Sequence, residues 1–250
     1  MPRYKLTLEY DGTRFVGWQR QANGLAVQEV IERALFAMSG EIVVIRGAGR
    51  TDAGVHATAQ VAHADLSRVW RCDVLRDGLN AHMRPHAVAI ILVEAVDDTF
   101  DARFSAVRRH YVYKLRNRRA PLTLEADREW LIKRKLDAGA MQAGAQLLLG
   151  THDFSTFRDS ECQADSPIRT LEQLDVSREG ETILVRVAAR SFLHRQVRSM
   201  VGSLEQVGSG RWTPQDLRAA LDARDRKFCG TVAPAAGLYL VGVDYEDTPG

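Results

Sequence analysis

The regular alternation of apolar and polar side chains in the first ten residues constrains the fold more than any other local feature. Residues 3–10 place four apolar side chains on one face and polar side chains on the other; the apolar ones are Tyr4, Leu6, Leu8 and Tyr10. A period of two predicts a strand with one buried face. Such a face needs a second layer of secondary structure to cover it, so the chain must fold around a sheet.

Later segments mix this strand period with the helical one. Helical spacing predicts helices at residues 27–38, 136–149 and 193–207, and Thr213–Pro214 has the residue types that begin another helix. Strands are predicted at 42–45, 88–96, 109–115, 182–187 and 238–243. This mixed order is typical of the α+β class. We expect an N-terminal half (1–108) and a C-terminal half (109–250), with the polar segment 117–137 as the best candidate for the connection between halves.

Composition excludes several classes of protein. The chain has 250 residues, 45% hydrophobic and 26% charged, which is ordinary for a globular protein and rules out a disordered one. The longest apolar run, 87–93, is far shorter than the roughly 20 residues of a membrane span. The three cysteines are widely separated and odd in number, so they predict neither a disulfide framework nor a zinc site. We expect a cytoplasmic protein without a membrane partner.

Basic residues are concentrated in two stretches, although the net charge is only +2. Residues 102–119 contain no acidic residue, and tyrosines lie among seven basic ones: Arg103, Arg108, Arg109, Lys114, Arg116, Arg118 and Arg119. Residues 186–198 also contain no acidic residue and carry Arg186, Arg190, Arg195 and Arg198. One interpretation is a solvated basic face. The other is a surface that contacts phosphates and stacks on bases, and the presence of two stretches near glycine-containing motifs favours RNA.

The segment from Gly49 to Ala57 is the most unusual in the chain. It reads G-R-T-D-A-G-V-H-A, with Asp52 at its centre and Arg50 nearby. Asp52 could simply cap its own backbone in a tight turn. Alternatively, the loop holds Asp52 at the floor of a cleft, where an arginine keeps the carboxylate ionised for nucleophilic or general-base chemistry.

This string resembles the signature of the TruA family of tRNA pseudouridine synthases, and five further motifs in order support the resemblance. The matching segments extend over nearly the whole chain: Tyr10–Thr13 with Gly17–Gln21, Phe100–Phe104 with Tyr111–Tyr113, Gly150–Phe154, Phe192–His194 through Val201–Gly202, and Gly237–Leu240. The resemblance implies a mixed, largely antiparallel sheet built from two similar halves flanked by helices, with the active-site cleft between the halves.

The resemblance also implies a function and a set of site residues. The expected reaction is isomerisation of uridine to pseudouridine at positions 38 to 40 of the tRNA anticodon stem-loop, by a homodimer that needs no cofactor and no metal. Asp52 matches the catalytic aspartate, Tyr111 the tyrosine that stacks on the target base, and Arg198 the arginine that pairs with the aspartate. Arg50 matches an arginine that assists base flipping, and Leu238 belongs to the last motif. Further candidates for RNA contact are Arg103, Arg109, His56 and Arg195.

Some residues depart from the family pattern or suggest other functions. Arg195, Gln196 and Asp101 stand where the family commonly has other residues, which affects the expected details of RNA contact and not the chemistry. One alternative function is an RNA-binding module without activity. The other is a metal-dependent phosphohydrolase built on His152 and Asp153. His56 and His63 are more simply structural than metal ligands.

Overall fold

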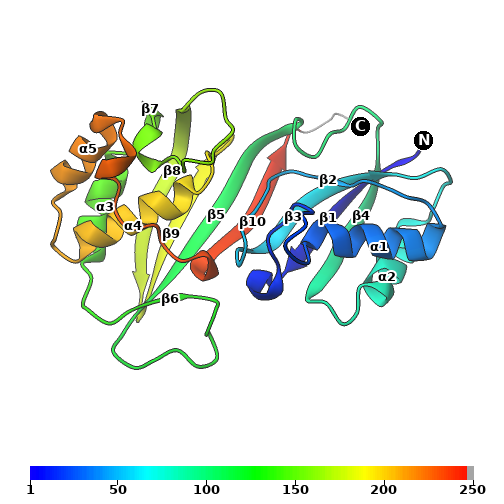
Figure 1. The fold of residues 1–250 in the computed structure, drawn as a ribbon, viewed down its shortest axis with the longest axis horizontal. Coiled ribbons are helices and arrows are strands. Elements are labelled where there is room, and N and C mark those ends of the chain that lie inside the picture. The colour runs from blue at the N-terminus through cyan, green and yellow to red at the C-terminus, as the bar shows by residue number, and fades with distance from the viewer. Residues whose placement is uncertain (247–250) are drawn as a thin grey trace. The chain divides into compact units, whose positions relative to one another are not determined.

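The chain divides into two units, each of which contains strands and helices (Figure 1). A computed structural model describes residues 1–246. Unit 1 comprises residues 1–109 and the segment from Tyr239 onward, and unit 2 comprises His110–Leu238. The chain passes from one unit to the other within β5 (Ala106–Asn117) and at the start of β10 (Leu238–Tyr245). No helix in the described part of the chain is long and apolar enough to span a membrane.

The strands of unit 1 have the order β4-β1-β3-β10. Its strands are β1 (Arg3–Tyr10), β3 (His56–Asp65), β4 (Val88–Val96) and β10, and the two-residue β2 (Arg46–Gly47) pairs with β3. β1 runs antiparallel to both β3 and β4, whereas β10 runs parallel to β3 with Tyr239 opposite His56. The predicted bounds of β1 and β4 are confirmed, and the four apolar side chains of β1 are all buried.

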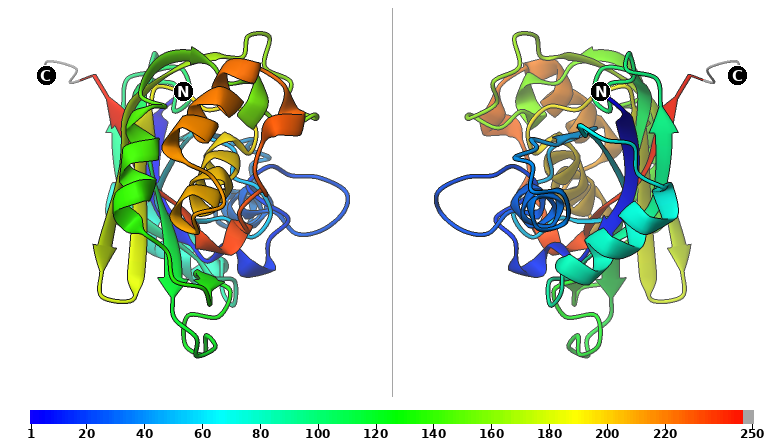
Figure 2. Two further views of the ribbon diagram at one scale, coloured as in Figure 1. Left: turned by 90° about the vertical axis from the view of Figure 1, so that its left-hand side faces the viewer. Right: turned by 90° about the vertical axis from the view of Figure 1, so that its right-hand side faces the viewer.

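Two helices, α1 (Val27–Ser39) and α2 (Cys72–His82), pack beside the sheet of unit 1 (Figure 2). α1 buries the predicted apolar stripe, and α2 packs against both α1 and β4. α1 ends where Gly40 adopts a left-handed conformation (φ +74°) and donates its N–H to the Phe36 carbonyl. Glycine adopts this conformation without steric cost, so the predicted end of the helix is confirmed.

The strand predicted at residues 42–45 is wrong. Ile42 and Val44 are exposed, and no regular strand forms there. The Ile45 N–H donates to Glu32 Oε1, and the Ile45 carbonyl accepts from Gln28 Nε2, both on α1. Because side chains of the helix satisfy this backbone, the segment is extended without joining the sheet.

The strands of unit 2 have the order β5-β9-β8-β7, with β6 paired to β5. Its remaining strands are β6 (Trp130–Ile132), β7 (Gly150–Asp153), β8 (Ile168–Glu179) and β9 (Thr182–Ala189). β7 and β9 are both antiparallel to β8, whereas β6 is parallel to β5. Alternate residues of β5 are buried, including Arg109, Tyr113 and Leu115, whereas Arg108 is exposed.

Three helices complete unit 2: α3 (Ala138–Gln146), α4 (Gln196–Gly208) and α5 (Pro214–Ala223). α3 packs on β8 and contacts both α4 and α5. α5 begins as predicted, with Pro214 in its first turn and a capping box in which the Thr213 and Asp216 side chains bond each other's backbone N–H. Short 3₁₀ helices lie at Gly12–Arg14, Ser155–Phe157, Arg226–Phe228 and Ala235–Gly237.

The predicted class, α+β with a mixed and largely antiparallel arrangement of strands, is confirmed. The two units differ from the expected halves 1–108 and 109–250 because β10 pairs with β3 and so places Tyr239 in unit 1. Segment 117–137 is not the connection between units. It lies inside unit 2, where β6 pairs with β5 in parallel.

Candidate functional site

The candidate site residues are divided between the two units. Arg50, Asp52, His56, Arg103 and Arg109 lie in unit 1. Tyr111, Arg195, Arg198 and Leu238 lie in unit 2. Each group has its own supporting contacts, which fix the local positions of these side chains.

The backbone of the Asp52 loop is held directly by the segment that follows β1. Gly17 and Asp52 form an antiparallel bridge, and the Trp18 N–H donates to the Thr51 carbonyl at 3.0 Å. Gly17 has φ +113°, and a Cβ atom there would lie 2.6 Å from the Thr51 oxygen. Only glycine therefore allows this close approach. Asp52 itself is half-buried, and its carbonyl accepts from the Val55 N–H.

Buried polar side chains also hold the loop, through hydrogen bonds to Gly49 and Thr51. The Tyr10 hydroxyl and the Thr51 hydroxyl are 2.8 Å apart, and Gln60 Nε2 donates to the Gly49 carbonyl. Burial of the Tyr10 phenol raises its pKa to about 12, so this hydroxyl is protonated at neutral pH. The loop that carries Asp52 is thus fixed at several points, which is the condition for a precisely placed catalytic group.

His56 has a positioning role in unit 1. Its Nδ1 accepts from the Gly12 N–H at 3.0 Å and lies 3.3 Å from Asp11 Oδ1. Its ring stacks on Tyr239 of β10, with the ring centroids 4.7 Å apart. The side chain is buried, so this geometry favours a structural role over the expected contact with RNA. His63 is similar, because its Nδ1 accepts from the Ala102 N–H.

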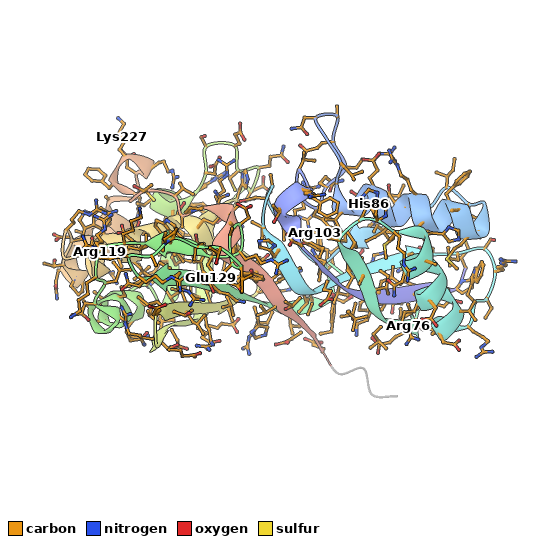
Figure 3. All side chains as sticks on the ribbon, turned by 90° about the horizontal axis from the view of Figure 1, so that it is seen from below. Arg76, His86, Arg103, Arg119, Glu129 and Lys227 are labelled. Carbon is orange, nitrogen blue, oxygen red and sulfur yellow. The ribbon has the colours of Figure 1, made fainter. Side chains whose placement is uncertain are left out.

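The two arginines expected to contact RNA in unit 1 differ sharply. Arg109 is only 8% exposed, and its guanidinium donates to the carbonyls of Ala48, Ala106 and Arg103. These bonds use its donors to hold the start of the Asp52 loop, which favours support of the loop over a phosphate contact. The Arg103 side chain, which is labelled in Figure 3, is exposed and lies over the Phe104 ring. Arg50 is also exposed.

In unit 2, the half-buried Tyr111 ring stands edge-on to Phe192, with centroids 5.3 Å apart and planes at 90°. This contact fixes the plane of the tyrosine ring. Arg198 on α4 donates from Nε to the Ala233 carbonyl at 2.8 Å, and the Ala233 N–H donates to the Arg198 carbonyl. The arginine is thereby tied to the segment that leads into β10.

The same segment is packed tightly before Leu238. The Tyr113 hydroxyl donates to the Pro234 carbonyl, and a Cβ at Gly237 would lie 2.6 Å from the Tyr113 ring. At Gly202 on α4, a Cβ would lie 1.5 Å from the Thr231 oxygen. Leu238 is buried. Its position is set by the two close contacts of the preceding segment, one with the Tyr113 ring and one with the backbone of α4.

Arg195 and Gln196 form the start of α4. Arg195 has φ +56° and pairs with Asp159 at 3.0 Å, so its charge is partly used within unit 2. Gln196 is buried, and its Oε1 accepts from the Leu193 N–H, which gives this departure from the family pattern a structural role. α4 begins at Gln196 and not at residue 193 as predicted, because residues 193–195 form the turn that these contacts close.

The described residues bring together one group that could hold a metal ion: Asp159, Glu161 and His194. The Arg195 guanidinium beside Asp159 offsets the negative charge that would attract a cation. The pair considered for a phosphohydrolase lies elsewhere. His152 Nε2 bonds the Leu149 carbonyl, and Asp153 caps the Ser155 N–H, so both have ordinary structural partners.

Sequence reasoning missed part of this support. Gly17 was recognised only as a matching residue, although a glycine shortly after a strand could have indicated a close backbone approach. Gln60 gave no signal, because nothing distinguishes it from the other polar residues of an alanine-rich strand.

Comparisons with known proteins agree on one family. A family model described as tRNA pseudouridine synthase matches residues 7–105 and 145–246. A protein of Beijerinckia indica named tRNA pseudouridine synthase A is 72% identical over 247 residues, which cover 99% of this chain and 95% of that protein. Proteins of the same name from Methylocella silvestris (68% identical, 99% and 100% covered) and Brucella ovis (61% identical, 98% and 98% covered) are also similar.

Proposed function

The chain belongs to the tRNA pseudouridine synthase family, which isomerises uridine to pseudouridine in tRNA, and we propose that Asp52 is the group that carries out this reaction. The observation that supports this role most is the fixed loop. Its backbone is hydrogen-bonded to Gly17 and Trp18, and the buried side chains of Tyr10 and Gln60 also bond to it. A carboxylate on a rigid loop retains its position while a substrate is brought to it.

The reaction breaks the N1–C1′ bond of uridine and joins C5 of the base to C1′. The C5 proton is lost in the same turnover, and N1 takes up a proton. An ionised Asp52 either attacks C1′ or removes a proton from the sugar, and both routes stay open. Because the far edge of a stacked base is buried, the uridine must leave the stack before it reacts.

The remaining candidates have roles in holding the flipped uridine. The Tyr111 ring is oriented by Phe192 and can stack on the base. Arg198 is fixed by Ala233 and provides a cation for Asp52 or the substrate, as in the family pattern. Arg50 and Arg103 are exposed and suit phosphate contacts. Leu238 contributes an apolar contact near the base.

The main test replaces Asp52 with asparagine, which keeps size and polarity and removes the charge. With tRNA labelled with tritium at C5 of uridine, we expect Asp52→Asn to release no tritium and to bind tRNA as the wild type does, because phosphate contacts supply most of the affinity. Asp77→Asn is the matched control, since Asp77 is an exposed carboxylate on α2 paired with Arg76. Turnover by Asp52→Asn near the wild-type rate would contradict the assignment.

A second measurement tests the substrate site. We propose that the modified uridines are at positions 38 to 40 of the anticodon stem-loop, by resemblance to the family. Mapping of pseudouridine by sequencing, after incubation of tRNA with the protein, should find the modification there. Modification confined to another arm of the tRNA would contradict this proposal.

We also propose a homodimer in the cytoplasm. Three thiols without disulfide bonds suit a reducing compartment, and the dimer follows from the family resemblance alone. Light scattering of the purified protein should give twice the mass of the chain, and fractionation of cells should recover it with the soluble proteins. A monomeric mass across the concentration range would contradict the dimer.

A further inference from the structure

A cavity of about 630 Å³ in unit 2 has a lining dominated by basic side chains. Six of the eight lining residues are cations, and none is acidic: Arg118, Arg119, Lys133, Arg134, Lys135 and Arg178, with Asn117 and Leu136. From these residues we propose that the cavity is a binding site for phosphate groups of the tRNA backbone, separate from the site that holds the reacting uridine. The proposal rests on the proposed function for the identity of the RNA.

The sheet brings the basic residues together. β5 and β6 are parallel, with Asn117 opposite Ile132 at their last residues. Because parallel strands end at the same edge, the two basic runs that follow them, 118–119 and 133–135, emerge side by side. Arg178, near the end of β8, completes the lining from a third strand.

Asn117 fixes the shape of the cavity. Its Nδ2 donates to the carbonyls of Ile132 and Arg134, and its Oδ1 accepts from the Leu136 N–H and from Arg178 Nη2. All the hydrogen-bonding capacity of one amide side chain is thus used to join the three strands. The cavity is a built feature of the fold, and it exists before any ligand arrives.

Much of the charge in the lining is not neutralised. Arg118 pairs with Glu181 and Arg134 pairs with Glu205. Arg119, Lys133 and Lys135 are exposed, and none of the carboxylates in residues 1–246 lies within salt-bridge distance of them. Arg119 is labelled in Figure 3.

The residue types of the lining also indicate the class of ligand. Clustered guanidinium and ammonium groups with no aromatic lining suit a phosphate and not a base.

The position of the cavity distinguishes it from the uridine site within unit 2. Asn117 lies six residues after Tyr111 along β5, a separation of roughly 20 Å in an extended strand. Consecutive phosphates of one strand are only about 3.4 Å apart along a duplex axis. The cavity would therefore contact phosphates several nucleotides from the target uridine.

The test compares two triple variants of the full-length protein with the same change in net charge. Arg119→Gln/Lys133→Gln/Lys135→Gln removes the unpaired cations of the cavity. Arg33→Gln/Arg71→Gln/Arg76→Gln is the control, since none of these arginines is buried and each is paired with a nearby acidic residue of unit 1. tRNA binding is measured across a salt titration, and single-turnover isomerisation is measured at saturating protein.

We expect the cavity variant to bind tRNA at least tenfold more weakly at low salt. The slope of log affinity against log salt should fall by roughly 2, because each lost phosphate contact removes about 0.7–0.9. Its single-turnover rate at saturation should equal that of the wild type. Ethylation of individual phosphates should identify a group of phosphates that matter to the wild type and not to the variant.

Equal affinities and slopes for the two triple variants would overturn the proposal, as would identical ethylation patterns for the cavity variant and the wild type. These readouts concern binding and do not depend on turnover. If the wild type failed to isomerise uridine, the proposed function would fail while the binding comparison still decided whether the cavity contacts RNA.

Discussion

Replacement of Gly17 by alanine tests whether the fixed loop is what makes Asp52 effective. Gly17 has φ +113°, and the added Cβ would lie 2.6 Å from the Thr51 oxygen. An ordinary contact at this position needs at least about 3.4 Å, so the backbone next to Asp52 must move by roughly 0.8 Å. Misplacement of a reacting group by about 1 Å can cost on the order of 100-fold in rate.

We therefore expect Gly17→Ala to lower kcat by roughly 10- to 100-fold, with little change in the affinity for tRNA. Backbone strain and the close contact together should cost about 2–6 kcal/mol of unfolding free energy. The assay is tritium release at saturating tRNA, at a temperature where urea unfolding shows the variant to be folded.

Gly40→Ala is the matched control, because Gly40 also has positive φ but a Cβ there meets no atom within 4 Å. It should lose about 1–2 kcal/mol of unfolding free energy from strain alone and retain the wild-type kcat. A Gly17→Ala enzyme within threefold of wild-type kcat would refute the reasoning that the Gly17 contact positions Asp52.

Three further predictions use the same contacts. Arg109→Ala should cost about 2–4 kcal/mol in urea unfolding, because buried carbonyls lose a charged donor, whereas the exposed Arg108→Ala should cost under about 0.5 kcal/mol; equal losses would contradict the supporting role of Arg109. Tyr111→Phe should retain stacking on the target base, whereas Tyr111→Ala should lose roughly 1–3 kcal/mol of it, and identical single-turnover kinetics of the two variants would contradict the stacking role. Burial raises the pKa of Tyr10 from about 10 in the unfolded chain to about 12, so the stability that its protonated hydroxyl contributes is complete below pH 10 and is lost as the pH rises toward 12. The free energy of unfolding of Tyr10→Phe, measured with urea, should therefore fall less over this pH range than that of the wild type. An unchanged fall would contradict the burial effect.

The elements that were predicted correctly are those whose pattern coincides with their burial. β1 alternates without interruption, and α5 has both its threonine cap and its proline, so their starts could be predicted. β3 was missed because it is rich in alanine and is buried on both faces along much of its length, so it shows no sustained alternation of apolar and polar side chains. α2 was missed because only Leu75 and Leu79 are buried, which is too sparse a stripe to define a helix.

The sequence suggested the residues proposed here as reactive, but not the contacts that hold them in place. Asp52 could be identified from a string of nine residues and its resemblance to a family. The supporting role of Arg109 could not be predicted, because a charged residue in a basic stretch gives no indication that the carbonyls of Ala48 and Arg103, 61 and 6 residues away, will accept hydrogen bonds from it. Such contacts depend on how strands and loops meet in the folded unit, and local patterns do not contain that information.

The pairing of β10 with β3 has a consequence for the order in which unit 1 can be completed on the ribosome. The residue of β10 that pairs with His56 is Tyr239, 130 residues after the first part of the unit ends at Arg109. At the usual rates of protein synthesis, roughly 6 to 26 s pass between the synthesis of Arg109 and that of Tyr239. During that interval the edge of β3 has no neighbouring strand at His56, and the His56 ring lacks the Tyr239 ring on which it stacks. The nascent chain therefore exposes an open sheet edge next to the Asp52 loop until its last strand is made, and this edge is where chaperones would act and where prematurely ended chains would aggregate.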